Sequence, residues 1–267
     1  MINITAINFN QQETAEMDQL KVLWEQQLNS NIPIRLTIEK VAIGNGLLGL
    51  TIPNGVFAPN HGTANCWYVS ALADKISNLD HQPGQPDGAI YIDSAVPWYI
   101  GPANQIPQHQ YDFFSNVLHE MGHAFGYVGL FSTNNNNDGL YGRLTAQIIP
   151  PHINLPFAFP ALNGWPSILG LATLSQHSNQ ALVTPGTQCP AQGFTQLGQD
   201  LVSAALFRAH GGTRVVYAPG TFRLFSSFDH IDPTTYPQAL MQPALPPGVT
   251  RRVIDADSWS VLRNLGW

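Results

Sequence analysis

The segment from Asp112 to Gly126 reads DFFSNVLHEMGHAFG, and the expected fold is built around it. Asp112 is a typical N-cap residue, and apolar side chains recur after it at helical spacing. The stretch therefore predicts a helix with a broad apolar face buried in the core. Gly126 is expected to end this helix, because glycine tolerates positive φ and lets the chain turn sharply.

The motif His119-Glu120-Met121-Gly122-His123 lies inside this helix. A spacing of four residues puts both imidazoles on one helical face, where they can bind one tetrahedral ion. Glu120 then lies beside the open position of the metal and can take a proton from the water that the metal activates. Burying these groups in an apolar helix without a ligand would be costly. The motif therefore predicts a zinc site with His119 and His123 as ligands and Glu120 as the general base.

A catalytic zinc ion needs a third protein ligand. No glutamate follows Glu120, which excludes the zinc peptidases that use a later glutamate. The compact motif with a third histidine at position 129 is also broken, because the chain has Gly129 there. The remaining downstream candidates are Asp138, His152, His177, His210 and His230.

His230 is the favoured third ligand, because Met241 follows it closely in the segment Ala239-Leu-Met-Gln-Pro243. Asp138 remains the alternative, since the sequence from Asp138 to Gly142 resembles the D-x-x-Y-G element of aspartate-type zincins. The asparagines before Asp138 depart from the Gly-Thr expected in that group.

With these residues the chain resembles the metzincin zinc peptidases of the leishmanolysin-like branch. In that branch an insertion separates the HExxHxxG helix from the third histidine, and a Met-turn follows. The resemblance implies that His119, His123 and His230 bind Zn²⁺, that Glu120 is the catalytic base and that Met241 forms the Met-turn. No tyrosine lies two residues after Met241, so no tyrosine ligand is expected.

The resemblance extends over most of the chain. Cys66-Trp-Tyr68, Tyr217-Ala-Pro219 and the closing segment Leu262–Trp267 are similar to secreted bacterial relatives. It implies a zinc-dependent endopeptidase that hydrolyses internal bonds of a peptide or protein bound in extended conformation. The alternatives are a non-catalytic zinc-binding relic of the same fold and an aspartate-type zincin that uses Asp138.

The expected fold is metzincin-like α/β (α+β) in a single domain over residues 1–267. The N-terminal subdomain, about 1–126, holds a twisted sheet and the active-site helix, and an irregular C-terminal subdomain follows at about 127–267. Apolar periodicity and turn signals predict helices at 14–28, 66–76, 112–126 and 256–265, a regular segment at 201–210, and strands at 34–41, 47–52, 89–93 and 214–217.

The strand at 89–93 and the aromatic pair Trp98-Tyr99 fall where metzincins have the edge strand that binds the substrate by strand addition. A core strand followed by a packed tryptophan is the alternative interpretation. Asp232, two residues after His230, is expected either to orient a ligand or to cap the Pro-Thr-Thr turn that follows it. Cys66 and Cys189 either form a disulfide or remain two thiols.

The composition limits the partners. A net charge of −6 and only 11 Lys and Arg argue against a nucleic-acid ligand, because no basic stripe exists to neutralise phosphates. No apolar run approaches the roughly 20 residues that span a bilayer. We expect a monomer. The resemblance implies secretion, although the first ten residues lack the features of a signal peptide, so an intracellular or translocated effector is the alternative.

Overall fold

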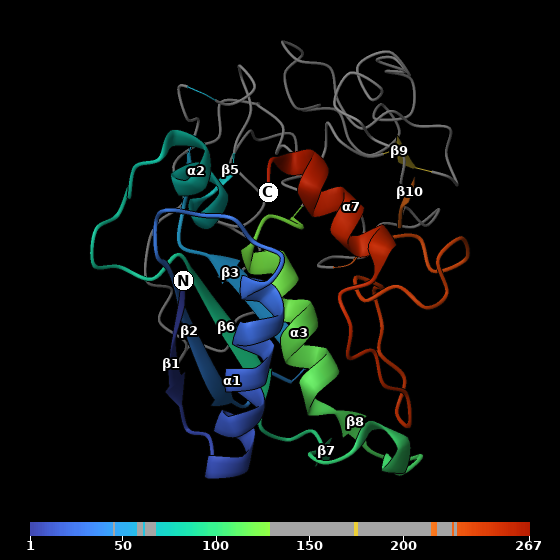
Figure 1. Cartoon of the computed structure of the whole chain (residues 1–267). Coiled ribbons are helices and arrows are strands. Elements are labelled where there is room, and N and C mark those ends of the chain that lie inside the picture. Colours follow the sequence, from blue (N-terminus) through green and yellow to red (C-terminus); the bar gives the residue numbers. More distant parts are fainter. Residues whose placement is uncertain are drawn as a thin grey trace.

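The computed structural model describes residues 1–44, 46–57, 61, 68–128, 174–175, 215–217, 226 and 229–267. They form a mixed α/β structure in which helices α1 and α3 lie side by side against one face of a four-stranded sheet (Figure 1). The strand order is β1 (Ile2–Ile7), β2 (Ile34–Val41), β6 (Gly88–Asp93) and β3 (Gly49–Pro53). The first three are parallel to one another and β3 is antiparallel to β6.

The position of β6 corrects one expectation. The strand predicted at 89–93 exists, but β6 is bonded to β2 on one side and to β3 on the other, and all its residues are buried. It therefore cannot pair with a substrate. Trp98, in β7 (Trp98–Tyr99), packs edge-on against Phe113 at 6.0 Å between ring centroids. The alternative, a core strand followed by a packed tryptophan, is confirmed.

Helix α1 (Gln11–Glu25) begins three residues before the predicted helix. Asn10 and Glu13 form a capping box there, since the Asn10 side chain accepts from the Glu13 N–H and the Glu13 carboxylate accepts from the Asn10 N–H. Met17, Leu20 and Trp24 are fully buried and anchor the helix to the sheet and to α3. Strand β1 was not predicted, although its residues alternate between apolar and polar over part of its length.

Helix α3 (Phe113–Ala124) confirms the helix predicted from Asp112. Asp112 is its N-cap, and the carboxylate accepts a hydrogen bond from the Ser115 N–H at 3.1 Å. Val117, Leu118 and Met121 are fully buried. The chain leaves the helix through Gly126 at a φ of +120°, a conformation that a side chain rarely tolerates, so the predicted turn is confirmed.

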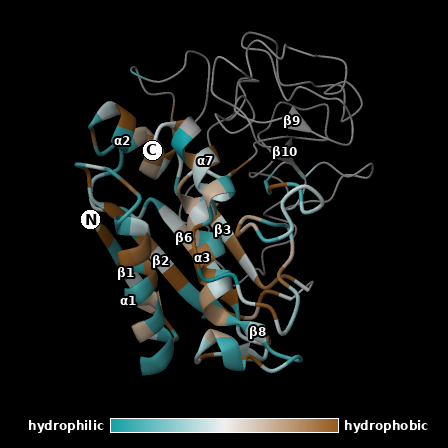
Figure 2. Ribbon diagram, turned by 45° about the vertical axis from the view of Figure 1, so that its right-hand side comes forward, coloured by the Kyte–Doolittle hydropathy of each residue, from teal (hydrophilic) through white to brown (hydrophobic). Residues whose placement is uncertain are grey.

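The C-terminal helix α7 (Ala256–Leu265) has the predicted bounds. Asp255 caps it by accepting from the N–H groups of Asp257 and Ser258. Val261 and Leu262 belong to the same core as α1, α3 and the residues Ile231, Leu240 and Met241. Figure 2 shows hydrophobic residues along the strands behind the helices. The C-terminal segment is thus packed directly onto the layer that carries the motif.

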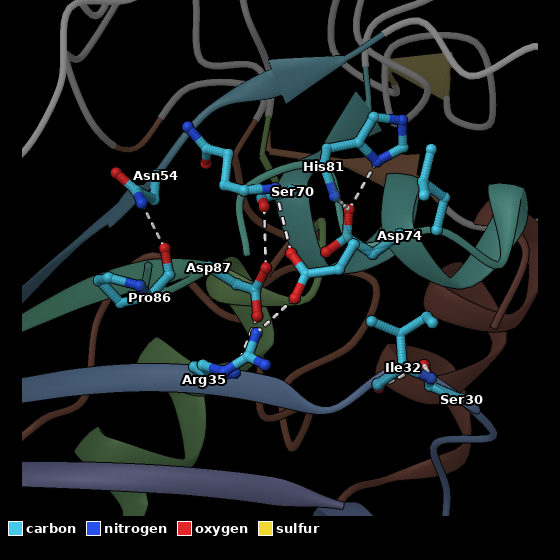
Figure 3. Close-up of polar contacts among 12 residues, drawn as sticks. Ser30, Ile32, Arg35, Asn54, Ser70, Asp74, His81, Pro86 and Asp87 are labelled. Carbon is cyan, nitrogen blue, oxygen red and sulfur yellow. Dashed lines mark hydrogen bonds and ion pairs between the residues drawn. The ribbon is translucent and has the colours of Figure 1, made fainter. Parts of the chain in front are cut away.

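Helix α2 (Ser70–Ser77) starts later than predicted, because Tyr68–Val69 form a strand, β5, paired with β4 (Val56–Phe57). A polar cluster joins it to the sheet (Figure 3). Asp87 accepts hydrogen bonds from the Ser70 hydroxyl and the Arg35 N–H, both at 2.8 Å. Burial raises the pKa of Asp87 to about 6.

The remaining described elements are short. Strand β8 (Tyr111–Asp112) pairs with β7, β9 (Leu174–Ser175) pairs with β10 (Val215–Val216), and Ala103–Gln105 form a 3₁₀ turn. The strand predicted at 214–217 is thus present in part. The segment 201–210, Cys66 and Cys189 lie outside the described residues. In the part of the chain that the structure describes, no helix is both long and apolar enough for a membrane crossing.

Candidate metal centre

Three histidines meet at one point beside α3. The Nε2 atom of His119 lies 3.0 Å from Nε2 of His123 and 3.2 Å from Nε2 of His230. His119 and His123 come from one face of the helix, whereas His230 comes from the C-terminal segment 111 residues after His119. The structure therefore brings together the three histidines that the sequence predicts as ligands, close enough to bind a metal ion.

The other ring nitrogen of each histidine faces a backbone carbonyl. Nδ1 of His119 lies 2.9 Å from the Leu240 oxygen, Nδ1 of His123 lies 2.5 Å from the Tyr127 oxygen, and Nδ1 of His230 lies 3.0 Å from the Ser226 oxygen. A nitrogen that faces a carbonyl must carry the proton, so the Nε2 atom of a neutral ring presents a lone pair. Three lone pairs then converge on one point, and a bound cation would relieve their repulsion.

The turn at Gly126 is part of this arrangement. The Gly126 N–H donates to the His123 oxygen at 3.0 Å, and the Tyr127 N–H donates to the Gly122 oxygen at 3.1 Å. The reversal of the chain places the Tyr127 carbonyl against Nδ1 of His123. The glycine of the motif therefore orients a histidine as well as ending the helix.

Burial keeps the three imidazoles neutral. It lowers the pKa of His119 to about 4, with a smaller lowering by the charge of Arg251. It lowers the pKa of His123 to about 3, and the neighbouring His119 lowers it further. The pKa of His230 also lies well below its usual value, again mainly because of burial. At neutral pH all three rings are in the protonation state that binds a metal. Three neutral imidazole nitrogens are a donor set that suits zinc.

Glu120 is held by the edge strand β3. The Thr51 hydroxyl lies 2.7 Å from Oε2 of Glu120 and 2.9 Å from its backbone oxygen. A Cβ atom at Gly49 would stand 2.6 Å from Oε1, so a glycine is required where the carboxylate approaches this strand. Burial raises the pKa of Glu120 to about 7, and the hydrogen bond from Thr51 opposes that rise. A carboxyl group with such a pKa can both accept and release a proton near neutrality.

Met241 packs against α3 at Gly122 of the motif. Its side chain is fully buried, and a Cβ atom at Gly122 would stand 2.5 Å from its sulfur. Its backbone oxygen accepts a hydrogen bond from the Ile231 N–H at 2.8 Å, next to His230. Met241 therefore connects the helix that carries two of the histidines with the segment that carries the third.

A cavity of about 300 Å³ opens beside the three histidines. Its wall combines the segment before and within β3, the side of α3 that carries the motif and the chain after Met241. Several residues of this wall had no sequence signal, because isolated polar residues in strands and loops carry no periodicity. They include Thr51, Tyr111, Ser115, Asn116, Gln242 and Arg251.

Asp232 has the second of its two expected roles. Its Oδ2 atom accepts hydrogen bonds from the N–H and the hydroxyl of Thr235, at 2.8 and 2.7 Å. It therefore caps the turn after Pro233. The other sequence candidates for a metal ligand, Asp138, His152, His177 and His210, lie outside the described residues.

Comparison of the chain with protein-family models, with curated proteins and with solved structures finds no match in any of the three.

Proposed function

We propose that this protein is a zinc-dependent endopeptidase with a metzincin-like fold of the leishmanolysin-like branch. The observation that carries the proposal is the convergence of three Nε2 lone pairs, each fixed by an Nδ1–carbonyl contact, in one cavity with a buried carboxylate. A structural zinc site would have a fourth protein ligand and no use for a base.

His119, His123 and His230 hold the zinc ion in this proposal. When bound there, zinc supplies Lewis-acid activation of a water molecule and of the carbonyl group of the scissile bond. The carbonyls of Leu240, Tyr127 and Ser226 keep each ring in the tautomer that presents Nε2.

Glu120 moves the proton. Its carboxylate takes a proton from water as the water oxygen bonds to the carbonyl carbon, and it delivers that proton to the nitrogen of the leaving amine as the C–N bond breaks. The Thr51 hydroxyl holds Oε2 during both steps and thereby limits rotation of the carboxylate.

The substrate binds as an extended peptide along β3. Among the described strands, β3 is bonded only to β6, so its other edge has main-chain groups available for a peptide. Residues from Gly46 to Thr51 line the cavity, which places this edge beside the histidines. The protein acts as a secreted monomer in this proposal.

The test compares wild type with Glu120→Ala, both at one zinc per chain, on a denatured and alkylated protein substrate. We expect wild type to cut and the variant to lose about 100-fold or more of the rate, because general base catalysis contributes about that much. Asp18→Ala removes an exposed carboxylate from α1 and should cut like wild type.

Two outcomes would contradict the proposal. Equal cutting by wild type and Glu120→Ala would exclude Glu120 as the base. A wild-type protein that binds zinc and cuts no substrate would favour a zinc-binding relic of the same fold.

A further inference from the structure

Arg251 lies on the wall of the cavity in a fixed position. Nη1 donates to the Ala244 oxygen at 2.8 Å and Nη2 donates to Oε1 of Gln242 at 2.7 Å. The Arg251 backbone N–H donates to the Ser115 hydroxyl in the first turn of α3 at 2.6 Å. The backbone of Arg251 is therefore bonded to α3 and its guanidinium to the loop after Met241, and all four of these residues line the cavity.

The charge of Arg251 has no ionic partner among the described residues. Its hydrogen bonds go to neutral oxygens and leave Nε without a partner. The neighbouring Arg252 differs, because it forms an ion pair with the buried Asp112 through Nε and Nη2. Asp255 influences Arg251 only from a distance, through its charge. Among the described residues of the cavity wall, Arg251 is therefore the cationic side chain whose charge no ion pair neutralises.

Asn116 adds a second donor without a partner. Its side chain is 4% exposed, lines the same cavity, and has no hydrogen-bond partner at Nδ2. It lies one helical turn before Glu120, so both residues are on the same face of α3. A buried donor without an acceptor is unfavourable, and an anionic acceptor in the cavity would remove that penalty.

The other charged groups of the wall are the carboxylates of Glu120 and Asp229. Among the described side chains of the wall, Arg251 and Asn116 are therefore the donors that favour an anion, in addition to the metal proposed at the three histidines. A rise of 1.5 Å per residue places Asn116 about 6 Å along the helix from Glu120, roughly two residues of extended peptide.

We propose that Arg251 and Asn116 form a carboxylate-binding subsite that selects peptides with a carboxylate within about two residues of the scissile bond. The inference rests on the proposed peptidase function and specifies its substrate class. The carboxylate belongs either to an aspartate or glutamate side chain or to the C-terminus of the peptide. Arg251 offers a planar fork that matches a carboxylate, and Asn116 donates from the helix.

The experiment measures binding to zinc-loaded Glu120→Ala by fluorescence anisotropy. The probes are fluorescein-labelled, C-terminally amidated alanine-rich hexapeptides with a glutamate at each position in turn, and the same peptides with glutamine. A third probe has glutamine and a free C-terminal carboxylate. We expect at least one carboxylate peptide to bind about tenfold or more tightly than its neutral counterpart, because charge-assisted bonds have about this effect.

Arg251→Gln in the Glu120→Ala background should abolish that preference. Arg263→Gln makes the same change of charge at an exposed position of α7 and should preserve it. Asn116→Ala should reduce the preference without removing any contact of Arg251, and it serves as a second test if Arg251→Gln does not fold. Whether the glutamate series or the free C-terminus has the advantage identifies the source of the carboxylate.

Three results would overturn the subsite. The carboxylate and neutral peptides could bind equally well, or neither could bind detectably. The third result is a preference for the carboxylate that survives both Arg251→Gln and Asn116→Ala. Because binding is measured on a variant that lacks the base, the result does not depend on peptidase activity. A wild-type protein that cuts nothing would contradict the proposed function, and the binding comparison would still decide the subsite.

Discussion

At the scale of single residues, Glu120 shows how two opposing effects give a carboxyl group a pKa near neutrality. Burial disfavours the charged form and raises the pKa to about 7, whereas the Thr51 hydroxyl stabilises the carboxylate and acts in the opposite direction. The side chain that moderates the pKa is on an edge strand, and the base is on a helix.

Thr51→Val removes this hydrogen bond and keeps the shape of the side chain. The pKa of Glu120 should rise, so a larger fraction is protonated at pH 7 and the acidic limb of the kcat/KM profile should move to higher pH. We expect about a tenfold loss of kcat/KM at pH 7, in line with a hydrogen bond to a charged group, at unchanged zinc content. Thr37→Val in β2 makes the same substitution away from Glu120 and should leave the pH profile unchanged. An unchanged profile in Thr51→Val as well would contradict an effect of the Thr51 hydroxyl on the pKa of Glu120.

The lowered pKa values of the histidines predict how the metal responds to acid. A proton competes with the metal for Nε2, and it competes only near or below the pKa of the ring. With a pKa of about 4 for His119 and about 3 for His123, zinc should be retained well below pH 6.5. Zinc content after dialysis at a series of pH values measures this, and release centred near pH 6.5 would be the contrary result.

At the scale of elements, α3 is defined at both ends by single residues. Asp112 satisfies the N–H of Ser115 and pairs with Arg252, and Gly126 turns the chain away after the second histidine. Between them, Gly122 allows Met241 to approach the backbone of the helix. The helix that carries the motif is therefore fixed by contacts that have no direct part in metal binding.

Asp112→Ala should lower the free energy of unfolding by about 2–4 kcal/mol, because it removes an N-cap and leaves Arg252 without its buried partner. Asn10→Ala, at the N-cap of α1, should lower it by only about 1 kcal/mol. Urea denaturation of the two variants compares the losses. Equal losses would mean that the ion pair between Asp112 and Arg252 contributes nothing.

Gly122→Ala should destabilise the protein by about 1–3 kcal/mol, because the new methyl group would meet the sulfur of Met241. Met241→Val shortens that side chain. The double variant should therefore be more stable than the sum of the two single losses predicts. Thermal and urea denaturation of wild type, the two single variants and the double variant give the four free energies of unfolding. Strictly additive losses would show that Gly122 and Met241 do not compete for the same space.

At the scale of the whole molecule, the three histidines join distant parts of the chain. Two are in α3, and the third is in a segment that the core holds against α3 through Ile231, Leu240 and Met241. A bound metal would therefore cross-link the helix layer to the C-terminal segment, and its binding free energy would add to the stability of the fold.

Zinc should accordingly raise the Tm of the metal-free protein. A ligand at a hundredfold excess over its Kd contributes about 2.7 kcal/mol, which corresponds to a few degrees in a protein of this size. His230→Ala should lose this increase, whereas His109→Ala, at an exposed position, should keep it. Calorimetry with and without a chelator measures the rise in Tm for each variant. A rise in His230→Ala equal to that of wild type would exclude His230 as a ligand.

The local features of this protein can be predicted from its sequence alone. The N-cap at Asp112, the helical spacing of apolar residues and Gly126 are sufficient to predict α3, and the same kinds of signal predict α7 and the approximate positions of β2, β3 and β6. They also place His119, Glu120 and His123 on one helix. These features depend on neighbours within one or two turns, so periodicity and capping reveal them.

How distant segments meet is visible only in the folded protein. The sequence favours His230 among several downstream candidates, but only the structure places its Nε2 atom 3.2 Å from that of His119. The sequence is compatible with β6 as an edge strand, but the structure places β3 beside it. No pattern in the sequence indicates that Thr51, Asn116 and Arg251 line the cavity. The physical reason is that contacts between residues far apart in the chain depend on the packing of the whole core, which no local pattern encodes.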